Sequence, residues 1–423
     1  MKRGQHRHSS PVSCGAGPDR VSASASQASV QKTGETPGEK RVQLAPKILK
    51  ATGVTLLGLL LSLILTTPFS ASVSGIFSTP ERGDFRMTDL YAQVADARPV
   101  RQLDDRIVLV DIGLADREEI AEALQTLSIC EPKAIGMDIN FPLPGDNDST
   151  LLEAISTTPG LVAPIGIEQK ADGKFALADR PFFYGTVPGL RYGVINLPAE
   201  RENASIREYA VDYPTADSRL TSFVMAVADI AEPAAAADTR RRGNPRETID
   251  YASRQFRSIS LDEIADNVGL INNRIVLLGA LTDAADMHAS PVNSYMSGLM
   301  IHAYSLSSLL DRKWLTVIPG WVDYVTAGFF SFILILTAVL TPTNRKWRGM
   351  ILRIFQIAIL MLTVVFGYFQ YIDHAMIFNF TNTLLMMAFG LFALDLWNGI
   401  EWMADGLKTV IRGKKQIKCA LNS

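Results

Sequence analysis

Runs of apolar residues divide the chain into segments of two different characters. One run lies near the N-terminus, at residues 51–65, and three more follow one another near the C-terminus. A helix needs about 20 mostly apolar residues to cross a hydrocarbon core of about 30 Å, and the three C-terminal runs meet that length. Aromatic residues stand near the ends of these runs, as interfacial aromatics do: Trp321, Tyr324, Trp347, Tyr368, Tyr371 and Trp397. The pattern predicts four membrane-spanning helices, at residues 49–68, 320–340, 350–371 and 376–397.

The first apolar run is the shortest and has a second interpretation. Lys47 and Lys50 precede it and Pro68 follows it, while the small residues at 70–72 would suit a signal peptidase. A cleaved signal peptide begins with a short basic segment, whereas this run follows a long polar one. The sequence therefore favours an uncleaved anchor over a signal peptide.

The two tails are polar but differ in pattern. Residues 1–46 are rich in Ser, Gly, Lys and Arg, with few large apolar residues, so they are predicted to be disordered. Residues 398–423 place apolar side chains at helical spacing between Lys and Arg. Such a segment suits a helix on an anionic membrane surface, and it equally suits a docking surface for a partner.

The segment at residues 70–318 alternates short β-branched apolar runs with stretches of helical periodicity. Alternating strands and helices predict a largely parallel sheet with helical crossovers. We expect one α/β domain with strands at 106–112, 133–139, 161–167, 192–196 and 273–279, and helices at 115–127, 150–156, 220–231 and 298–310. Residues 232–244 read as an exposed loop.

Charge gives this layout an orientation. Nine Lys and Arg residues precede the first run, further ones separate the second run from the third and follow the fourth, and the hairpin at 373–375 has none. Cytoplasmic loops carry an excess of Lys and Arg. With four spans, both termini are then cytoplasmic and residues 68–319 are external. That external segment carries 35 Asp and Glu against 23 Lys and Arg, a net charge of −12.

The composition excludes several classes of protein. A whole-chain net charge of −2 lacks the basic excess of a nucleic-acid binder. Three Cys residues cannot build a disulfide scaffold. Phosphate-loop, dinucleotide-binding, zinc-protease and serine-hydrolase motifs are absent from the sequence. We therefore expect no catalytic residue, no metal and no cofactor.

Polar residues in the expected spans suggest contacts between helices. Asn379 and Asn382 are three residues apart and share a helix face, which favours interhelical hydrogen bonds. Asp323 and Asp395 lie near the ends of their spans, where we expect them to reach the headgroups. The interiors carry almost no charge, which makes a transport path the weaker alternative.

Candidate ligand-binding residues lie where the expected strands end. Asp111 and Asp138 close the first two strands, and ligands of parallel sheets bind beyond the carboxyl ends of strands. The alternative is that each carboxylate caps a following loop or helix. Asp286 and His302 could join them in a site that binds a divalent metal or a ligand or carries out acid–base chemistry, with Asp283 and His288 nearby in sequence. His302 lies on an apolar helix, so a buried and satisfied histidine is the competing interpretation.

Several segments in a fixed order resemble a known family. They are Arg106–Ile112, Ala134–Phe141, Gly193–Asn196 and Arg274–Gly279, followed by Asp286, Pro291 and Gly298–Ala303. Together with one helix before them and three after, they resemble the bacterial extracellular sensor domain called CHASE, type two. The resemblance covers about residues 80–397. It departs from the family after the first strand, where residues 113–118 replace a Trp-Pro-Trp-Arg-like segment.

The resemblance implies an extracytoplasmic sensor that detects a ligand and signals through its membrane helices. Members adjoin output domains, yet about 26 residues follow Trp397 here, so we expect an effector protein in trans. Membrane lipid and a second copy of the chain are further expected partners. Arg207 stands where the family carries a D-G-V-R-like turn, and we expect it to pair with Asp111 or Asp138, to meet an anionic ligand, or to form a structural ion pair. The alternatives are an envelope hydrolase-like enzyme and a structural membrane subunit.

Overall fold

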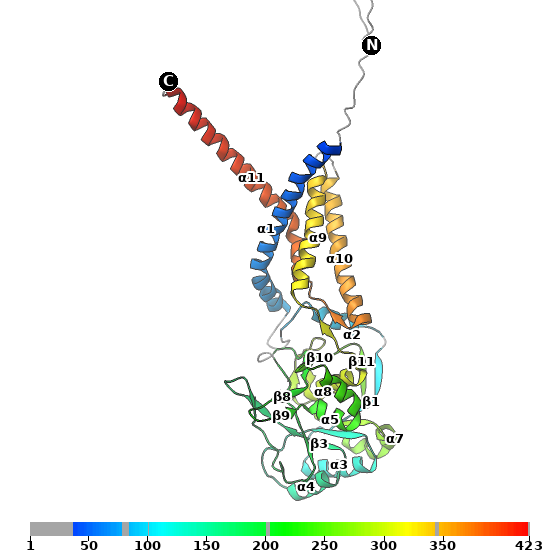
Figure 1. Ribbon diagram of the computed structural model, residues 1–423. Helices are drawn as coiled ribbons and strands as arrows, with labels where there is room; N and C mark the ends of the chain where they lie inside the picture. Colours follow the sequence, from blue (N-terminus) through cyan, green and yellow to red (C-terminus); the bar gives the residue numbers. More distant parts are fainter. Residues whose placement is uncertain (1–36, 78–83, 100, 200–203, 343–346, 422–423) are drawn as a thin grey trace, which may run out of the picture. The chain divides into compact units, whose positions relative to one another are not determined.

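The computed structural model describes residues 37–77, 84–99, 101–199, 204–342 and 347–421. Its centre is a six-stranded sheet in the order β11-β1-β12-β2-β3-β6, in which every neighbouring pair is parallel (Figure 1). The strands are β1 (Gln102–Asp111), β2 (Ala134–Asp138), β3 (Leu161–Ile165), β6 (Arg191–Val194), β11 (Arg254–Ser260) and β12 (Ile275–Gly279). The expected α/β fold with a mostly parallel sheet is confirmed.

Helices cover both faces of the sheet because the strands bury alternate side chains on opposite sides. In β1, Ile107 and Leu109 pack into one apolar core, and Val108 and Val110 pack into the other. Parallel sheets buried on both faces carry such continuous apolar runs. The first core contains residues of α5 (Phe223–Ala231), α6 (Pro233–Arg241) and α8 (Gly298–Asp311), and the second contains residues of α3 (Arg117–Ile129), α4 (Asp148–Thr157) and the short α7 (Val268–Ile271).

Side-chain caps mark the starts of α3, α5 and α8 in this domain. Asp116 caps α3 and forms a reciprocal capping box with Glu119. Ser222 caps α5 and Ser297 caps α8 through their hydroxyl oxygens. These caps fix where each crossover leaves the sheet. The remaining short strands form two-stranded pairs: β4 (Ile167–Gln169) with β5 (Phe175–Leu177), β7 (Glu208–Ala210) with β10 (Arg246–Thr248), β8 (Asp212–Pro214) with β9 (Arg219–Thr221), β13 (Met287–His288) with β14 (Met296–Ser297), and β15 (Thr316–Val317) with β16 (Met376–Ile377).

The structure corrects one expected segment and adds one strand to the six-stranded sheet. Residues 232–244, interpreted as an exposed loop, contain α6, with Pro233 in its first turn. Proline is tolerated there because the first helical N–H groups lack internal partners, and the alanines that follow are strong helix formers. The edge strand β11 was not expected from its sequence, because charged residues interrupt its apolar positions.

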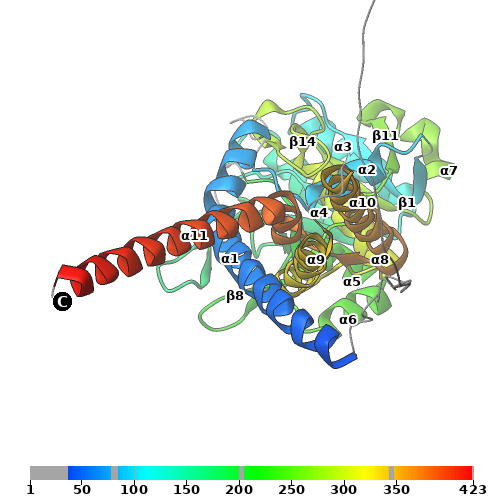
Figure 2. The ribbon, with the colours of Figure 1, turned by 90° about the horizontal axis from the view of Figure 1, so that it is seen from above.

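Four helices among the described residues are long and apolar enough to cross a membrane. They are α1 (Pro37–Phe77), α9 (Trp321–Leu340), α10 (Arg348–His374) and α11 (Thr381–Leu421), and Figures 1 and 2 show them grouped together. They pack through an apolar cluster that includes Val54, Leu334, Ile359 and Met387. The start of α1 lies within the tail expected to be disordered, whose residues 1–36 are outside the described residues. The fourth span begins at Thr381, because Met376 and Ile377 form β16 instead.

A polar cluster joins three of the membrane helices. Asp323 of α9 is buried, and its carboxylate accepts hydrogen bonds from both the backbone N–H and the side chain of Asn382 and of Thr383, at 2.8–3.0 Å. Ser62 of α1 donates to Asn382 at 3.3 Å. The expected interhelical bonding is confirmed for Asn382, whereas Asn379 lies before α11 and its Oδ1 accepts hydrogen bonds from Thr381. The expectation that Asp323 reaches the headgroups is wrong, because the first N–H groups of α11 need an acceptor and this carboxylate supplies it.

Candidate functional site

The carboxyl ends of three adjacent strands hold two of the expected aspartates. Asp111 of β1 is in register with Gly279 of β12, and Gly279 is in register with Asp138 of β2. The two carboxylates therefore flank β12 at one edge of the sheet, where parallel α/β sheets bind ligands. The structure places them in different environments.

Asp111 holds the loops that leave the sheet. Its Oδ1 accepts hydrogen bonds from the backbone N–H of Gly113 at 3.2 Å and of Leu281 at 3.0 Å. It thereby ties the turn after β1 to the turn after β12. This is the capping role that competed with ligand binding in the sequence.

Asp138 faces a histidine across the start of α8. The side chains of Asp138 and His302 are 10% and 6% exposed, and their Oδ2 and Nε2 atoms lie 3.9 Å apart. The His302 ring also lies against Phe223 of α5, with centroids 4.9 Å apart. Both groups are thus held in the apolar layer between the sheet and its helices.

Asp286 connects this pair to the helix start. Its Oδ2 accepts from the N–H of Gly298 at 3.0 Å, and its Oδ1 lies 3.1 Å from Nε2 of His288. A Cβ atom on residue 298 would lie 2.7 Å from both carboxylate oxygens, so glycine permits this approach. Negative charge at a helix N-terminus is favourable. The structure therefore brings together Asp138, Asp286, His288 and His302, and leaves Asp111 at the neighbouring turn.

Burial sets the protonation of the pair. It raises the pKa of Asp138 to about 7, with a further contribution from the negative charge of Asp286. It lowers the pKa of His302 to about 4, although Asp286 and the backbone of Ile195 favour the charged ring. Desolvation disfavours the charged form of each group, and a separation of 3.9 Å is too long for a hydrogen bond. At neutral pH, His302 is therefore neutral and Asp138 is partly protonated.

The side chains of this edge do not form a metal centre. Within residues 37–421, as far as the structure describes them, no group of three or more His, Cys, Asp or Glu side chains is arranged to hold a metal ion. Cys130 is buried in the second core.

Arg207 lies elsewhere and pairs with neither of the aspartates expected for it. Its Nε and Nη2 donate to the two carboxylate oxygens of Asp89, at 2.8 and 2.7 Å, and its Nη1 donates to Oδ1 of Asp84 at 3.1 Å. Nη2 also donates to the carbonyl of Asp84 at 2.7 Å. Arg207 is thus a buried structural ion pair, and it fastens the segment before α2 (Asp89–Asp96) to the domain.

The same interactions set the acidity of Asp84. Burial alone would raise the pKa of Asp84, but the N–H of Ser205 and the guanidinium of Arg207 lower it overall. These partners were missed by sequence reasoning, because Asp84 and Asp89 lie more than a hundred residues before Arg207 with no pattern to link them. The acidic residues in the segment after the first span were the sequence signal that could have pointed to these partners of Arg207.

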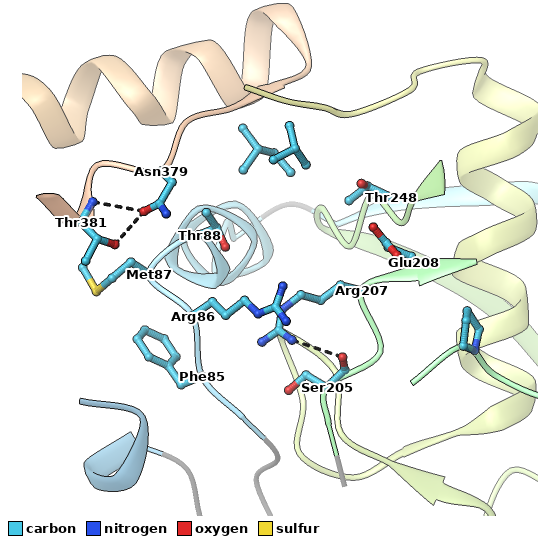
Figure 3. Close-up of a pocket in the computed structure, with 13 residues that line it drawn as sticks. Phe85, Arg86, Met87, Thr88, Ser205, Arg207, Glu208, Thr248, Asn379 and Thr381 are labelled. Carbon is cyan, nitrogen blue, oxygen red and sulfur yellow. Dashed lines mark hydrogen bonds between the residues drawn. The ribbon is translucent and has the colours of Figure 1, made fainter. Parts of the chain in front are cut away.

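A cavity of about 330 Å³ adjoins this ion-pair cluster (Figure 3). Figure 3 shows the segment Phe85–Thr88 between Arg207 and Ser205 on one side and Asn379 and Thr381 on the other. A second cavity of about 550 Å³ shares Phe85, Met87 and Ser205 and extends to residues 290–294. Both cavities lie beside the connections between the sheet domain and the membrane helices, where a bound ligand would contact both parts.

Comparison with known proteins agrees with this architecture. A family model for the CHASE2 domain matches residues 60–338, which include the sheet domain and parts of two membrane helices. No curated protein and no solved structure matches the chain. The parallel sheet domain, with one candidate membrane helix before it and three from Trp321 onward, belongs to the CHASE2 family of sensor-type extracellular domains.

Proposed function

We propose that the protein is a membrane-bound sensor subunit that detects an extracytoplasmic signal and passes it through its membrane helices to a partner in trans. The observation that carries this proposal is a shared apolar core. The core on the α5 and α8 face of the sheet includes Tyr371 at the end of α10 and Ile377 in β16. A rearrangement of that core would therefore act directly on the connection between α10 and α11, because packed interiors resist local deformation.

Polar contacts reinforce this junction. The hydroxyl of Tyr371 donates to Oδ1 of the buried Asp250 at 3.1 Å, and its ring stacks on Tyr91 of α2 with centroids 6.1 Å apart. Arg98 donates to the hydroxyl of Tyr368 at 3.0 and 3.2 Å. The end of α10 is thus held by α2 and by the segment after β10.

A second connection runs through α8. This helix starts at Gly298, on the carboxylate of Asp286, and ends at Asp311, shortly before β15 and α9. β15 pairs in parallel with β16, and Asp323 of α9 caps α11. A shift of α8 would therefore reach α9 and α11 together. A coupling free energy of about 1–3 kcal/mol between the signal site and the partner site would change the affinity at either site 5- to 150-fold.

The proposed orientation follows from charge. The Lys and Arg residues before the first span, between the second and third, and after the fourth support a bacterial inner membrane topology with both termini cytoplasmic. Residues 68–319 would then meet the extracytoplasmic signal. The proposal assigns no catalytic step to the chain. The burial of Asp138 and His302 supports this choice over a hydrolase-like enzyme, whose acid and base must reach substrate.

Affinity capture of the full-length protein from its native membranes, with mass spectrometry, tests the trans partner. The matched control replaces residues 398–423 by a flexible linker of equal length. We expect a protein with a cytoplasmic output domain to be enriched with the intact chain and lost with the control. Recovery of the chain alone, or equal recovery of every companion with the control, would contradict output through this tail.

A further inference from the structure

The last membrane helix continues well past the membrane. At about 1.5 Å per residue, the 41 residues of α11 extend for about 60 Å, roughly twice a hydrocarbon core. Directly after Trp397, Lys50 of α1 donates to Asn398 at 2.8 Å and pairs with Glu401 at 2.5 Å. Because these groups are polar and charged, the apolar region of α11 ends near Trp397. No proline interrupts Thr381–Leu421. The residues from Ile400 onward therefore leave the membrane as a continuation of the same helix.

This extension exposes an apolar stripe with a seven-residue repeat. Leu396, Ile400, Met403, Leu407 and Val410 alternate in spacings of four and three. Met403 is 60% exposed and Leu407 62%, so the chain itself covers neither. The sequence continues the same spacing through Lys414, Ile417 and Leu421. Apolar residues sustained at these spacings are the pattern of a coiled coil.

The stripe faces away from the rest of the chain. At 100° per residue, Glu401 lies about 140° around the helix from the centre of the stripe, and Glu401 is the residue that meets α1. The contact with α1 therefore leaves the stripe free for another helix.

The distribution of charge fits a helix of the same sequence. The charged residues Glu401, Asp405, Lys408 and Arg412 occupy the outer positions of the repeat. The positions that flank the stripe are uncharged, and several are small: Gly399, Ala404, Gly406, Ile411 and Gly413. Two identical helices can thus meet along the stripe without opposing like charges at its edges in this region.

We propose that the stripe Leu396–Val410 on α11 binds the same stripe of a second copy of this chain, as a parallel, in-register, two-stranded coiled coil outside the membrane. The pairing is parallel because two copies in one membrane with the same topology send their α11 helices out on the same side.

The alternative occupant of the stripe is the membrane surface. It is less well matched, because the helix continues without interruption past Trp397 and would have to bend sharply there to lie on the membrane. The dimer does not depend on the proposed sensing role, since a failure to dimerise would leave the junction around Tyr371 unchanged.

Cysteine scanning of the full-length protein in native membranes tests the pairing. In a Cys14→Ser, Cys419→Ser background, with the buried Cys130 retained, single cysteines replace stripe residues (Ile400→Cys, Leu407→Cys, Val410→Cys) or outer residues (Asp405→Cys, Lys408→Cys). Oxidation should link the stripe variants into dimers at least fivefold more than the outer variants. Equal linking at all positions, or none, would overturn the proposal. Shielding of the stripe thiols from a water-soluble maleimide without dimer formation would place the helix on the membrane instead.

A second measurement excludes a dimer formed elsewhere. Leu407→Asp removes an apolar core position, whereas Thr409→Asp adds the same charge on the outer side of the helix, where residue 409 is exposed. Mass determination in detergent should give a dimer for the unchanged chain and for Thr409→Asp, and a monomer for Leu407→Asp. A Leu407→Asp variant that stays dimeric would show that the stripe is not the interface.

Discussion

At the scale of single residues, the buried pair Asp138 and His302 has the clearest pH signature. The pKa of Asp138 is about 7 in the folded protein against 3.8 ordinarily, so between these values the folded state binds the extra proton and stability falls as pH rises. The pKa of His302 is about 4 against 6.5, so there the unfolded state binds the extra proton and stability rises with pH. The two contributions oppose each other between about pH 4 and 6.5.

Two complementary variants separate these contributions. Asp138→Asn leaves the contribution of His302, so the free energy of unfolding should rise from pH 4 to 6.5 more steeply than in the unchanged protein. His302→Asn leaves the contribution of Asp138, so stability should fall from pH 4 to 7. Thermal unfolding of the full-length protein at a series of pH values measures both slopes. Parallel profiles for all three proteins would show that the pair does not titrate in this way.

Arg207 gives the largest single-residue effect that we expect on stability. Its side chain is 13% exposed and that of Asp89 only 4%, so Arg207→Gln takes the guanidinium from a buried carboxylate. Breaking a buried ion pair from one side costs about 3–5 kcal/mol. Arg101→Gln is the matched control, because Arg101 is 53% exposed and its pairing with Asp96, at 3.3 Å, should contribute at most about 1 kcal/mol. Chemical unfolding that gives similar losses for both would contradict a structural role for Arg207.

At the scale of elements, α11 depends on a cap from another helix. Asp323→Ala removes the acceptor for Asn382 and Thr383 at the start of α11, and we expect a loss of about 2 kcal/mol or more. Asp395→Ala, on the exposed side of the same helix, should change stability little. The thermal midpoints of the full-length variants in nanodiscs compare the two, and equal midpoints would mean that the cap is dispensable.

The elements themselves could largely be predicted, since their period and composition are local. The strands β1, β2 and β12 read as apolar runs because they are buried on both faces. α6 was missed because Glu232 and Pro233 resemble a loop, although proline suits a first helical turn. The candidate site was harder to predict from the sequence, because β12 lies between β1 and β2 and thereby determines which acidic residues are neighbours. The strand order results from pairing between segments far apart in the sequence, so local periodicity cannot predict it.

At the scale of the whole molecule, the sheet domain and the membrane helices share one apolar core at the junction around Tyr371. The ring of Tyr371 belongs to the apolar core of the sheet domain, while the backbone of Tyr371 lies in the last turn of α10, the third membrane helix. The buried Asp250 receives hydrogen bonds from the Tyr371 hydroxyl at 3.1 Å and from Lys313 at 3.3 Å. One carboxylate is therefore shared between α10 and the segment that follows α8.

Removing only the hydroxyl of Tyr371 tests whether this junction holds the two parts together. Tyr371→Phe keeps the ring and its packing on Tyr91 but removes one hydrogen bond to Asp250. Because such a bond contributes about 1 kcal/mol, amide hydrogen exchange at residues 248–252 and 375–377 should accelerate about three- to tenfold. Tyr368→Phe is the control, because its hydroxyl only accepts from the exposed side chain of Arg98. Exchange should then change near Arg98 alone. If Tyr371→Phe leaves exchange unchanged on both sides of the junction, the hydrogen bond does not couple the sheet domain to α10, and the coupling must rest on the shared apolar core or on α8 and the cap on α11.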